Sequence, residues 1–160
     1  MTVIIIIALL VTMIVPMMGE MRSRAQRANC VNNLRGLYAA ASACLDSTQQ
    51  WPQVAPKLIQ DDPPEYARRW VAALKPYGLA PTNWVCPTIQ RQLGNPDINS
   101  RKGARVDYLA TPFDVSPILP RKYSTQPWFV ERGDVHGDGN LVILASGSVK
   151  SLRELLNEGR

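Results

Sequence analysis

The first eighteen residues of the chain form an uninterrupted apolar segment. No charged residue occurs in residues 1–18, and fifteen of the eighteen are aliphatic or Met. At about 1.5 Å per residue, an apolar helix of this length is about long enough to cross the core of a bilayer. The sequence therefore predicts a membrane helix. The residues predicted to form it are Val3, Ile4, Ile5, Ile6, Ile7, Leu9, Leu10, Val11, Ile14, Val15 and Pro16.

Two other roles of this apolar segment fit the sequence less well. A secretory signal peptide begins with basic residues and ends at a small-residue cleavage site. Here no basic residue precedes the apolar core, and residues 16–20 lack an A-x-A pattern. A buried core helix is normally shorter and less uniformly apolar. Three arginines follow the apolar segment: Arg22, Arg24 and Arg27. By the positive-inside rule they favour a cytoplasmic location for the part of the chain that follows the membrane helix.

A helical pattern continues beyond the apolar segment to about Ser47. Apolar residues recur at steps of three and four, the spacing of one face of an α-helix. Opposite this stripe lie the polar residues Arg22, Gln26, Asn29, Asn33 and Arg35. We expect the stripe to pack against the C-terminal part of the chain. It consists of Met18, Met21, Ala25, Ala28, Val31, Leu34, Leu37, Tyr38, Ala41, Cys44 and Leu45.

The remaining residues predict a small antiparallel sheet and short helices. Asp62 and the two prolines after it start a helix that stops at Gly78. Alternating and continuous apolar runs predict short strands, with a tight turn at residues 146–147. The strands are expected at 105–110, 128–131, 141–145 and 149–152, an exposed loop at 94–105, and a last helix at 152–157.

The predicted fold class is α+β, with a small antiparallel sheet packed on one long N-terminal helix. Residues 1–18 are the predicted transmembrane half of that helix, and residues 19–47 are its amphipathic half. Residues 48–160 form the predicted globular domain.

Charge and composition restrict the functional class. The net charge is +5, but the basic residues are scattered, without the run of five or more that marks a nucleic-acid tail. No constellation of nucleophile, base and orienting group is evident, so we do not predict an enzyme. The four tryptophans are expected to anchor the core or its loops rather than to stack on bases. They are Trp51, Trp70, Trp84 and Trp128.

Three cysteines leave two alternatives open. Cys30 and Cys44 lie on the same predicted helix, about 21 Å apart along its axis, so they cannot bridge each other. Any disulfide must therefore involve Cys86, which a turn of the chain at Trp84 is expected to return to the core. The alternatives are a Cys30–Cys86 disulfide or buried thiols.

Residues 134–140 resemble a calcium-binding loop and contain the single histidine. Asp134, Asp138 and Asn140 supply the oxygen ligands that calcium prefers. Ala145 stands where an EF-hand has an acidic ligand, so a plain polar turn is favoured over a calcium site, and no other cofactor is expected. Because His136 has no clustered Cys or His and no nucleophile beside it, a hydrogen-bonded structural role is favoured over a zinc or catalytic site.

Residues 24–37 (RAQRANCVNNLRGL) resemble the R-A-x-x-x-x-C-x-N-N-L-[KR]-x-L stretch of one bacterial subfamily of type IV pilin-like proteins, the type II secretion pseudopilins. The matching positions include Asn32, Asn33 and Leu34. Later W-P, C-P and H-x9-D-G motifs of that subfamily are similar to Trp51–Pro52, Cys86–Pro87, and His136 followed by Ser146–Gly147. Ser146 replaces the aspartate of the last motif, so no role of that carboxylate is carried over. The resemblance spans residues 1 to about 152.

The same resemblance bears on the start of the chain. In this family, mature chains carry a glutamate at the fifth position and a helix proline near the twenty-second. Aligning that proline with Pro16 puts the glutamate two residues before Met1. We therefore expect Met1 to be an internal methionine, preceded by a few mature residues and a basic leader. The alternative is a true start with Ile5 in place of the glutamate.

The resemblance implies a structural subunit that polymerises through its N-terminal apolar helix, residues Val3 to Pro16, into a pseudopilus or surface filament. It places the subunit in the inner membrane as a single-pass protein with a periplasmic C-terminal domain, and implies protein secretion. The implied partners are further copies, other pseudopilins, an assembly platform, a secretion ATPase and a prepilin peptidase. Calcium in a C-terminal loop is also found in such proteins. The alternative is a minor pilin whose basic loop, with Arg101, Lys102 and Arg105, binds DNA.

Overall fold

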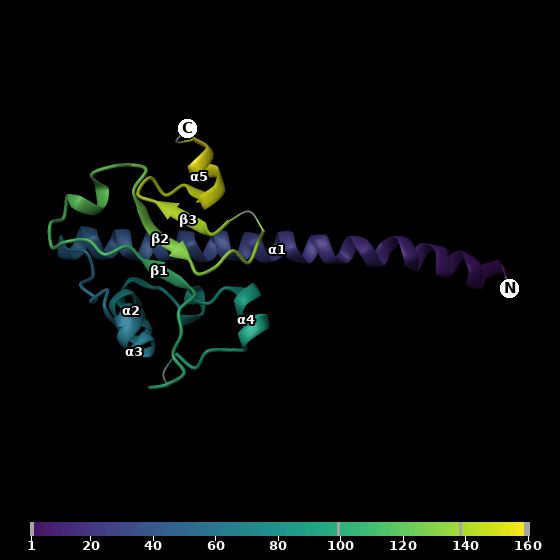
Figure 1. Cartoon of the computed structure of the whole chain (residues 1–160), viewed down its shortest axis with the longest axis horizontal. Helices are drawn as coiled ribbons and strands as arrows, with labels where there is room; N and C mark the ends of the chain where they lie inside the picture. The colour runs from purple at the N-terminus through teal and green to yellow at the C-terminus, as the bar shows by residue number, and fades with distance from the viewer. Residues whose placement is uncertain (1, 99, 138, 159–160) are drawn as a thin grey trace.

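The computed structural model describes residues 2–98, 100–137 and 139–158, and of residues 2–18 it describes only the backbone. Its dominant element is one continuous helix, α1 (Thr2–Thr48), of 47 residues. At 1.5 Å per residue this helix is roughly 70 Å long. Figure 1 shows that its C-terminal half lies within the domain and that its N-terminal half projects away from it. The predicted continuation of the helix to about Ser47 is confirmed.

Helix α1 ends at a residue in the left-handed backbone region. Gln49 has φ 55, and its N–H donates to the carbonyl of Leu45 at 2.9 Å. A residue in this conformation directly after a helix satisfies one of the last carbonyl groups and turns the chain away. Residues 49–56 then lead into the rest of the domain.

The other elements form a compact α+β unit, as predicted. Four strands make one antiparallel sheet in the order β1-β2-β3-β4. The elements are α2 (Leu58–Asp61), α3 (Pro63–Leu74), η1 (Lys75–Tyr77), η2 (Pro81–Trp84), α4 (Pro87–Leu93), β1 (Tyr108–Ala110), η3 (Leu119–Arg121), β2 (Pro127–Glu131), β3 (Leu141–Leu144), β4 (Val149–Ser151) and α5 (Leu152–Glu158).

The sequence signals at α3 act as expected. The Asp62 side chain caps the helix by accepting from the N–H of Glu65, and Pro63 occupies the first helical turn. Gly78 ends the following turn with φ 81, a conformation that costs glycine little. The buried side of α3 carries Tyr66 and Trp70.

The sheet register brings the end of β2 to the start of β1. Tyr108 pairs with Glu131, and Ala110 pairs with Phe129. Strand β3 is buried along its whole length, which agrees with its uninterrupted run of Leu, Val and Ile. Apolar residues on the sheet, on α3 and on the C-terminal half of α1 form one core that includes all four tryptophans. The predicted core role of the tryptophans is confirmed.

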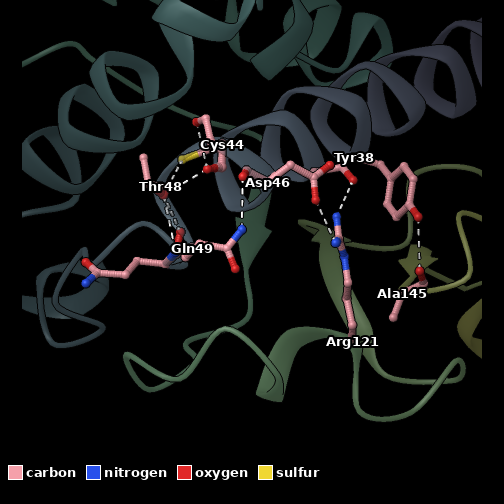
Figure 2. A network of polar contacts seen from close by, with 10 residues as sticks. Tyr38, Cys44, Asp46, Thr48, Gln49, Arg121 and Ala145 are labelled. Atoms are coloured by element: carbon pink, nitrogen blue, oxygen red, sulfur yellow. Dashed lines mark hydrogen bonds and ion pairs between the residues drawn. The ribbon is translucent and has the colours of Figure 1, made fainter.

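A polar network fixes the last turns of α1 to the domain. Arg121 donates to Asp46 Oδ1 at 2.7 Å and to Ser42 Oγ at 2.8 Å. Figure 2 shows the Arg121 side chain extending to Asp46 on the helix. Nearby, the hydroxyl of Tyr38 donates to the carbonyl of Ala145. Contacts from η3 and from the end of β3 therefore hold the same segment of the helix.

The apolar stripe of α1 contacts the domain over only part of its predicted length. Its buried positions begin at Cys30, whereas Ala25 and Ala28 are exposed and Met21 is 66% exposed. Asn33 is more buried than predicted. It is half-buried and donates to the carbonyl of Val85 at 3.0 Å instead of facing solvent.

The predicted membrane localisation needs a correction. Among the residues whose side chains the structure describes, no helix has both the length and the apolar character needed to span a bilayer. The inner-membrane, single-pass localisation with a periplasmic C-terminal domain is wrong on this finding. The charged residues of the described half of α1, from Glu20 to Arg35, are the physical reason. The residues predicted as the membrane helix, Val3 to Pro16 within residues 1–18, have side chains outside the described part.

Gly147, in the turn between β3 and β4, is a glycine at which an added methyl group should be costly. It has φ 78, and a Cβ there would lie 3.3 Å from Cε1 of Tyr38. We expect Gly147→Ala to lower the free energy of unfolding by about 2 kcal/mol, from backbone strain plus this contact. Urea unfolding followed by circular dichroism measures the loss. Gly137→Ala is the matched control, because Gly137 has φ 83 but nothing within 4 Å. Equal losses in both variants would show that the Tyr38 contact contributes nothing.

Candidate functional site

Four side chains with metal-binding or nucleophilic groups meet beneath the sheet. They are Cys30, Cys86, Glu131 and His136. Cys30 lies on α1, Cys86 directly precedes α4, Glu131 is the last residue of β2, and His136 follows in the loop to β3. Because each comes from a different segment, the folded domain rather than local sequence brings them together. We call them the buried cluster.

The distances within the buried cluster are short. One ligand atom from each of the four side chains can be chosen so that all lie within 4.8 Å of one another. The two Sγ atoms of Cys30 and Cys86 are 2.9 Å apart, and both cysteines are free thiols. Nε2 of His136 lies 3.3 Å from Oε1 of Glu131.

The cluster is almost completely shielded from solvent. Cys30 and Cys86 are fully buried, and the side chains of Glu131 and His136 are 0% and 2% exposed. Oε2 of Glu131 has no hydrogen-bond partner. An unpaired buried polar oxygen costs free energy, and the cost is larger when the group is charged.

Burial and mutual contact shift the protonation of these groups in different directions. The hydrogen bond with Cys86, together with burial, raises the pKa of Cys30. The same bond, with backbone N–H groups of Ile89 and Thr88, lowers the pKa of Cys86 to about 6. Cys86 is therefore the sulfur that most easily becomes a thiolate. Burial raises the pKa of Glu131 to about 7, and Cys86 adds to this increase.

A second buried carboxylate holds the cluster in place. Asp107 is 0% exposed, and its Oδ2 accepts from the backbone N–H of Cys86 at 2.9 Å. Its Oδ1 accepts from Nε of Arg105 at 2.8 Å. Burial raises the pKa of Asp107, whereas the Cys86 N–H and Arg105 lower it. Asp107 thus fixes the backbone that carries the Cys86 sulfur.

The structure changes the interpretation of His136. The expectation that no cysteine clusters with it is wrong, because the fold brings Cys30 and Cys86 to it. Its contact with Glu131 agrees with the expected hydrogen-bonded role. Of the two alternatives left open for the cysteines, the structure has buried free thiols, with the sulfurs of Cys30 and Cys86 in contact and Cys44 apart from them, near Thr48.

The calcium candidates form a turn rather than a converging set of ligands in the described residues. Oδ1 of Asp134 accepts from the N–H of Gly137 at 2.9 Å, and Nδ2 of Asn140 donates to the carbonyl of Glu131 at 2.9 Å. Asp138 lies outside the described residues. The weak calcium prediction named Asp134, Asp138 and Asn140. In the described residues, Asp134 and Asn140 instead make separate hydrogen bonds to the backbone.

The remaining motif residues have structural positions. Leu34 is fully buried in the core, Asn32 is exposed on α1, and Asn33 bonds to Val85 as described above. Gly147 forms the turn between β3 and β4, where an added Cβ would meet the ring of Tyr38.

The basic loop predicted for the alternative DNA-binding role is partly engaged within the domain. Arg105 is paired with Asp107 and also donates to the carbonyl of Gly94. The backbone carbonyls of Ser100 and Arg101 accept from Arg68. The side chains of Arg101 and Lys102 are exposed.

Sequence reasoning did not identify Glu131 and Asp107 as site residues. The one available signal was that both are acidic residues of predicted strands, Asp107 within 105–110 and Glu131 at the end of 128–131, where a solvent-exposed role is the simpler expectation. Comparison with protein-family models, with curated proteins and with solved structures gave no match to this chain. The resemblance to pilin-like proteins therefore stays a prediction.

Proposed function

We propose that this chain is a pilin-like structural subunit whose copies assemble into a filament through the N-terminal half of α1. The observation that carries the proposal is the projection of this helix. Side chains 19–25 are all exposed, and the helix extends from there to Thr2 without contacting the domain in Figure 1. Residues 2–25 correspond to roughly 36 Å of helix, which projects beyond the domain in Figure 1.

The amino-acid sequence of this projecting helix calls for a partner. Its first eighteen residues carry no charge. Removing one large aliphatic side chain from water contributes about 1.5–3 kcal/mol, so leaving many of them uncovered is strongly unfavourable. Identical helices packed side by side would cover one another, and they would leave the domains on the outside of the bundle.

The domain holds α1 firmly, because many residues of the helix are packed in the core. The core contacts α1 from Cys30 to Leu45, and Arg121 and Tyr38 add hydrogen bonds near its end. A pull on the helix would therefore be transmitted to the whole domain. The family resemblance adds the finer proposal that the filament serves type II-like protein secretion, with other pseudopilins, an assembly platform, a secretion ATPase and a prepilin peptidase as partners.

One substitution in the apolar segment tests this proposal. We expect Val11→Asp to abolish sedimentable filaments of the full chain, because a buried charge in a helix bundle costs several kcal/mol per copy. Negative-stain electron microscopy of the pelleted material measures the filaments.

Leu156→Asp is the matched control, since Leu156 is 65% exposed on α5. It introduces the same charge and should leave assembly unchanged. Filaments that persist in Val11→Asp, or that are lost equally in both variants, would rule out assembly through this helix.

A further inference from the structure

We propose that Cys30, Cys86, Glu131 and His136 form a structural zinc site, with both Sγ atoms, one Glu131 carboxylate oxygen and His136 Nε2 as the four ligands. The inference rests on the buried cluster alone and does not depend on filament assembly. It concerns how the domain is held to α1.

The ligand types are those that zinc selects. Zinc in structural sites is bound by four ligands drawn from thiolate, imidazole and carboxylate groups in a tetrahedron. Calcium requires six to eight oxygen ligands, and the cluster supplies sulfur and nitrogen as three of its four donors. Two cysteines, one histidine and one glutamate match zinc better than any hard cation.

The spacing is within about 1 Å of that of a tetrahedral site, since all four ligand atoms lie within 4.8 Å of one another. With Zn–S near 2.3 Å and Zn–N or Zn–O near 2.0 Å, ligand atoms lie about 3.3–3.8 Å apart. The distance from His136 Nε2 to Glu131 Oε1 is 3.3 Å, at the lower end of that range. The two sulfurs, at 2.9 Å, would need to separate by about 0.9 Å. Small changes in side-chain torsion provide such a movement.

An independent observation points to a missing cation. The Glu131 side chain is 0% exposed, and its Oε2 has no hydrogen-bond partner among the residues that the structure describes. Buried carboxylates are normally paired or bound to a metal, because desolvation of an unpaired one is costly. No Lys or Arg side chain is paired with Glu131 among the described residues. A zinc ion bound by this carboxylate would neutralise its charge and also compensate two thiolates.

The position of the site indicates what the metal does. All four ligands are provided by the protein and shielded from solvent, so no open coordination position is left for a substrate. The ligands come from α1, from the residue before α4, from the end of β2 and from the β2–β3 loop. A zinc ion there would join the projecting helix to the sheet and to the α4 region. Asp107 would orient the Cys86 ligand through its backbone N–H.

Metal content of the full chain tests the proposal. After purification in reducing buffer without chelator, we expect about one zinc ion per chain by mass spectrometry of the metal. Replacement by Co²⁺ should give a thiolate-to-Co²⁺ charge-transfer band and intense visible bands of tetrahedral cobalt. Cys86→Ser and His136→Gln should each weaken Co²⁺ binding at least tenfold.

Cys44→Ser is the matched control, because Cys44 is also buried but its sulfur lies near Thr48, outside the cluster. It should bind Co²⁺ as the unsubstituted chain does. The proposal is overturned if the reduced chain binds no zinc, if Co²⁺ binds without a thiolate band, or if Cys86→Ser binds it as well as Cys44→Ser. A Cys30–Cys86 disulfide that re-forms and excludes zinc under these conditions is likewise a negative result.

Chelation of the unsubstituted chain avoids the risk that a variant fails to fold. Because zinc would bind the folded state and not the unfolded one, its removal should lower the melting temperature. Added zinc, but not added Ca²⁺, should restore the original value. An unchanged melting temperature after complete removal of zinc would exclude a structural role.

Discussion

Trp128→Ala should lower the free energy of unfolding by about 4 kcal/mol, a large part of the total stability of a small domain. Trp128 is 0% exposed, and its ring centroid lies 4.8 Å from that of Tyr38 and 5.0 Å from that of Trp51. The indole Nε1 donates to the carbonyl of Pro120 at 2.6 Å. Truncation would open a large cavity between the sheet and α1, and it would leave that carbonyl unpaired.

Circular dichroism during urea unfolding measures this loss, because the signal does not depend on the removed indole. Trp128→Phe separates the two contributions: it keeps an aromatic ring and should recover more than half of the loss. Tyr123→Ala is the control for aromatic truncation, since Tyr123 is 59% exposed and should cost under about 0.5 kcal/mol. A loss in Trp128→Ala no larger than that in Tyr123→Ala would contradict the assigned role of this ring.

The elements of the fold were largely predictable because each carries a local signal. The continuous run at residues 141–144 marks a strand buried on both faces, and it is strand β3. Asp62, with prolines after it and Gly78 beyond, marks the helical segment that includes α3. What periodicity could not provide was the point at which α1 meets the domain. The spacing of Met21 and Ala25 fits the stripe. Both are nevertheless exposed, because the buried positions of α1 begin only at Cys30.

For Asn33 the helix was predicted correctly, but the side chain was assigned to the wrong face of it. Asn33 lies three residues after Cys30 and four before Leu37, so helical spacing puts it within the buried face. Because asparagine is polar, Asn33 was expected on the solvent-facing side of the helix, opposite the apolar stripe. In the structure its amide satisfies the carbonyl of Val85, a partner that no sequence pattern reveals.

The buried cluster was not predictable as a unit for a related reason. Cys30 and Cys86 were recognised as a possible pair because geometry excluded Cys30–Cys44. His136 and Glu131 lie near each other in sequence, but their meeting with the cysteines depends on the register of β1 with β2. Tyr108 pairs with Glu131 in that register, and Asp107 beside it reaches the N–H of Cys86. Long-range pairing of this kind has no local signature.

Asp107→Ala should lower the free energy of unfolding by about 3–5 kcal/mol when measured with a chelator present. Asp107 is fully buried, and its loss would leave the Cys86 N–H and Nε of Arg105 without their acceptor. Removing one partner of a buried ion pair is costlier than removing both. Asp107→Ala combined with Arg105→Ala should therefore lose less than the sum of the single variants.

Asp61→Ala provides the comparison for this buried carboxylate. Asp61 pairs with Lys57 at 3.6 Å, and both side chains are more than half exposed, so its removal should cost about 0–1 kcal/mol. Strict additivity of the two substitutions, or a loss in Asp107→Ala as small as that in Asp61→Ala, would contradict the role given to Asp107. The chelator keeps zinc out of this comparison, so the loss measured in Asp107→Ala reports the hydrogen bonds of Asp107 to the Cys86 N–H and to Arg105.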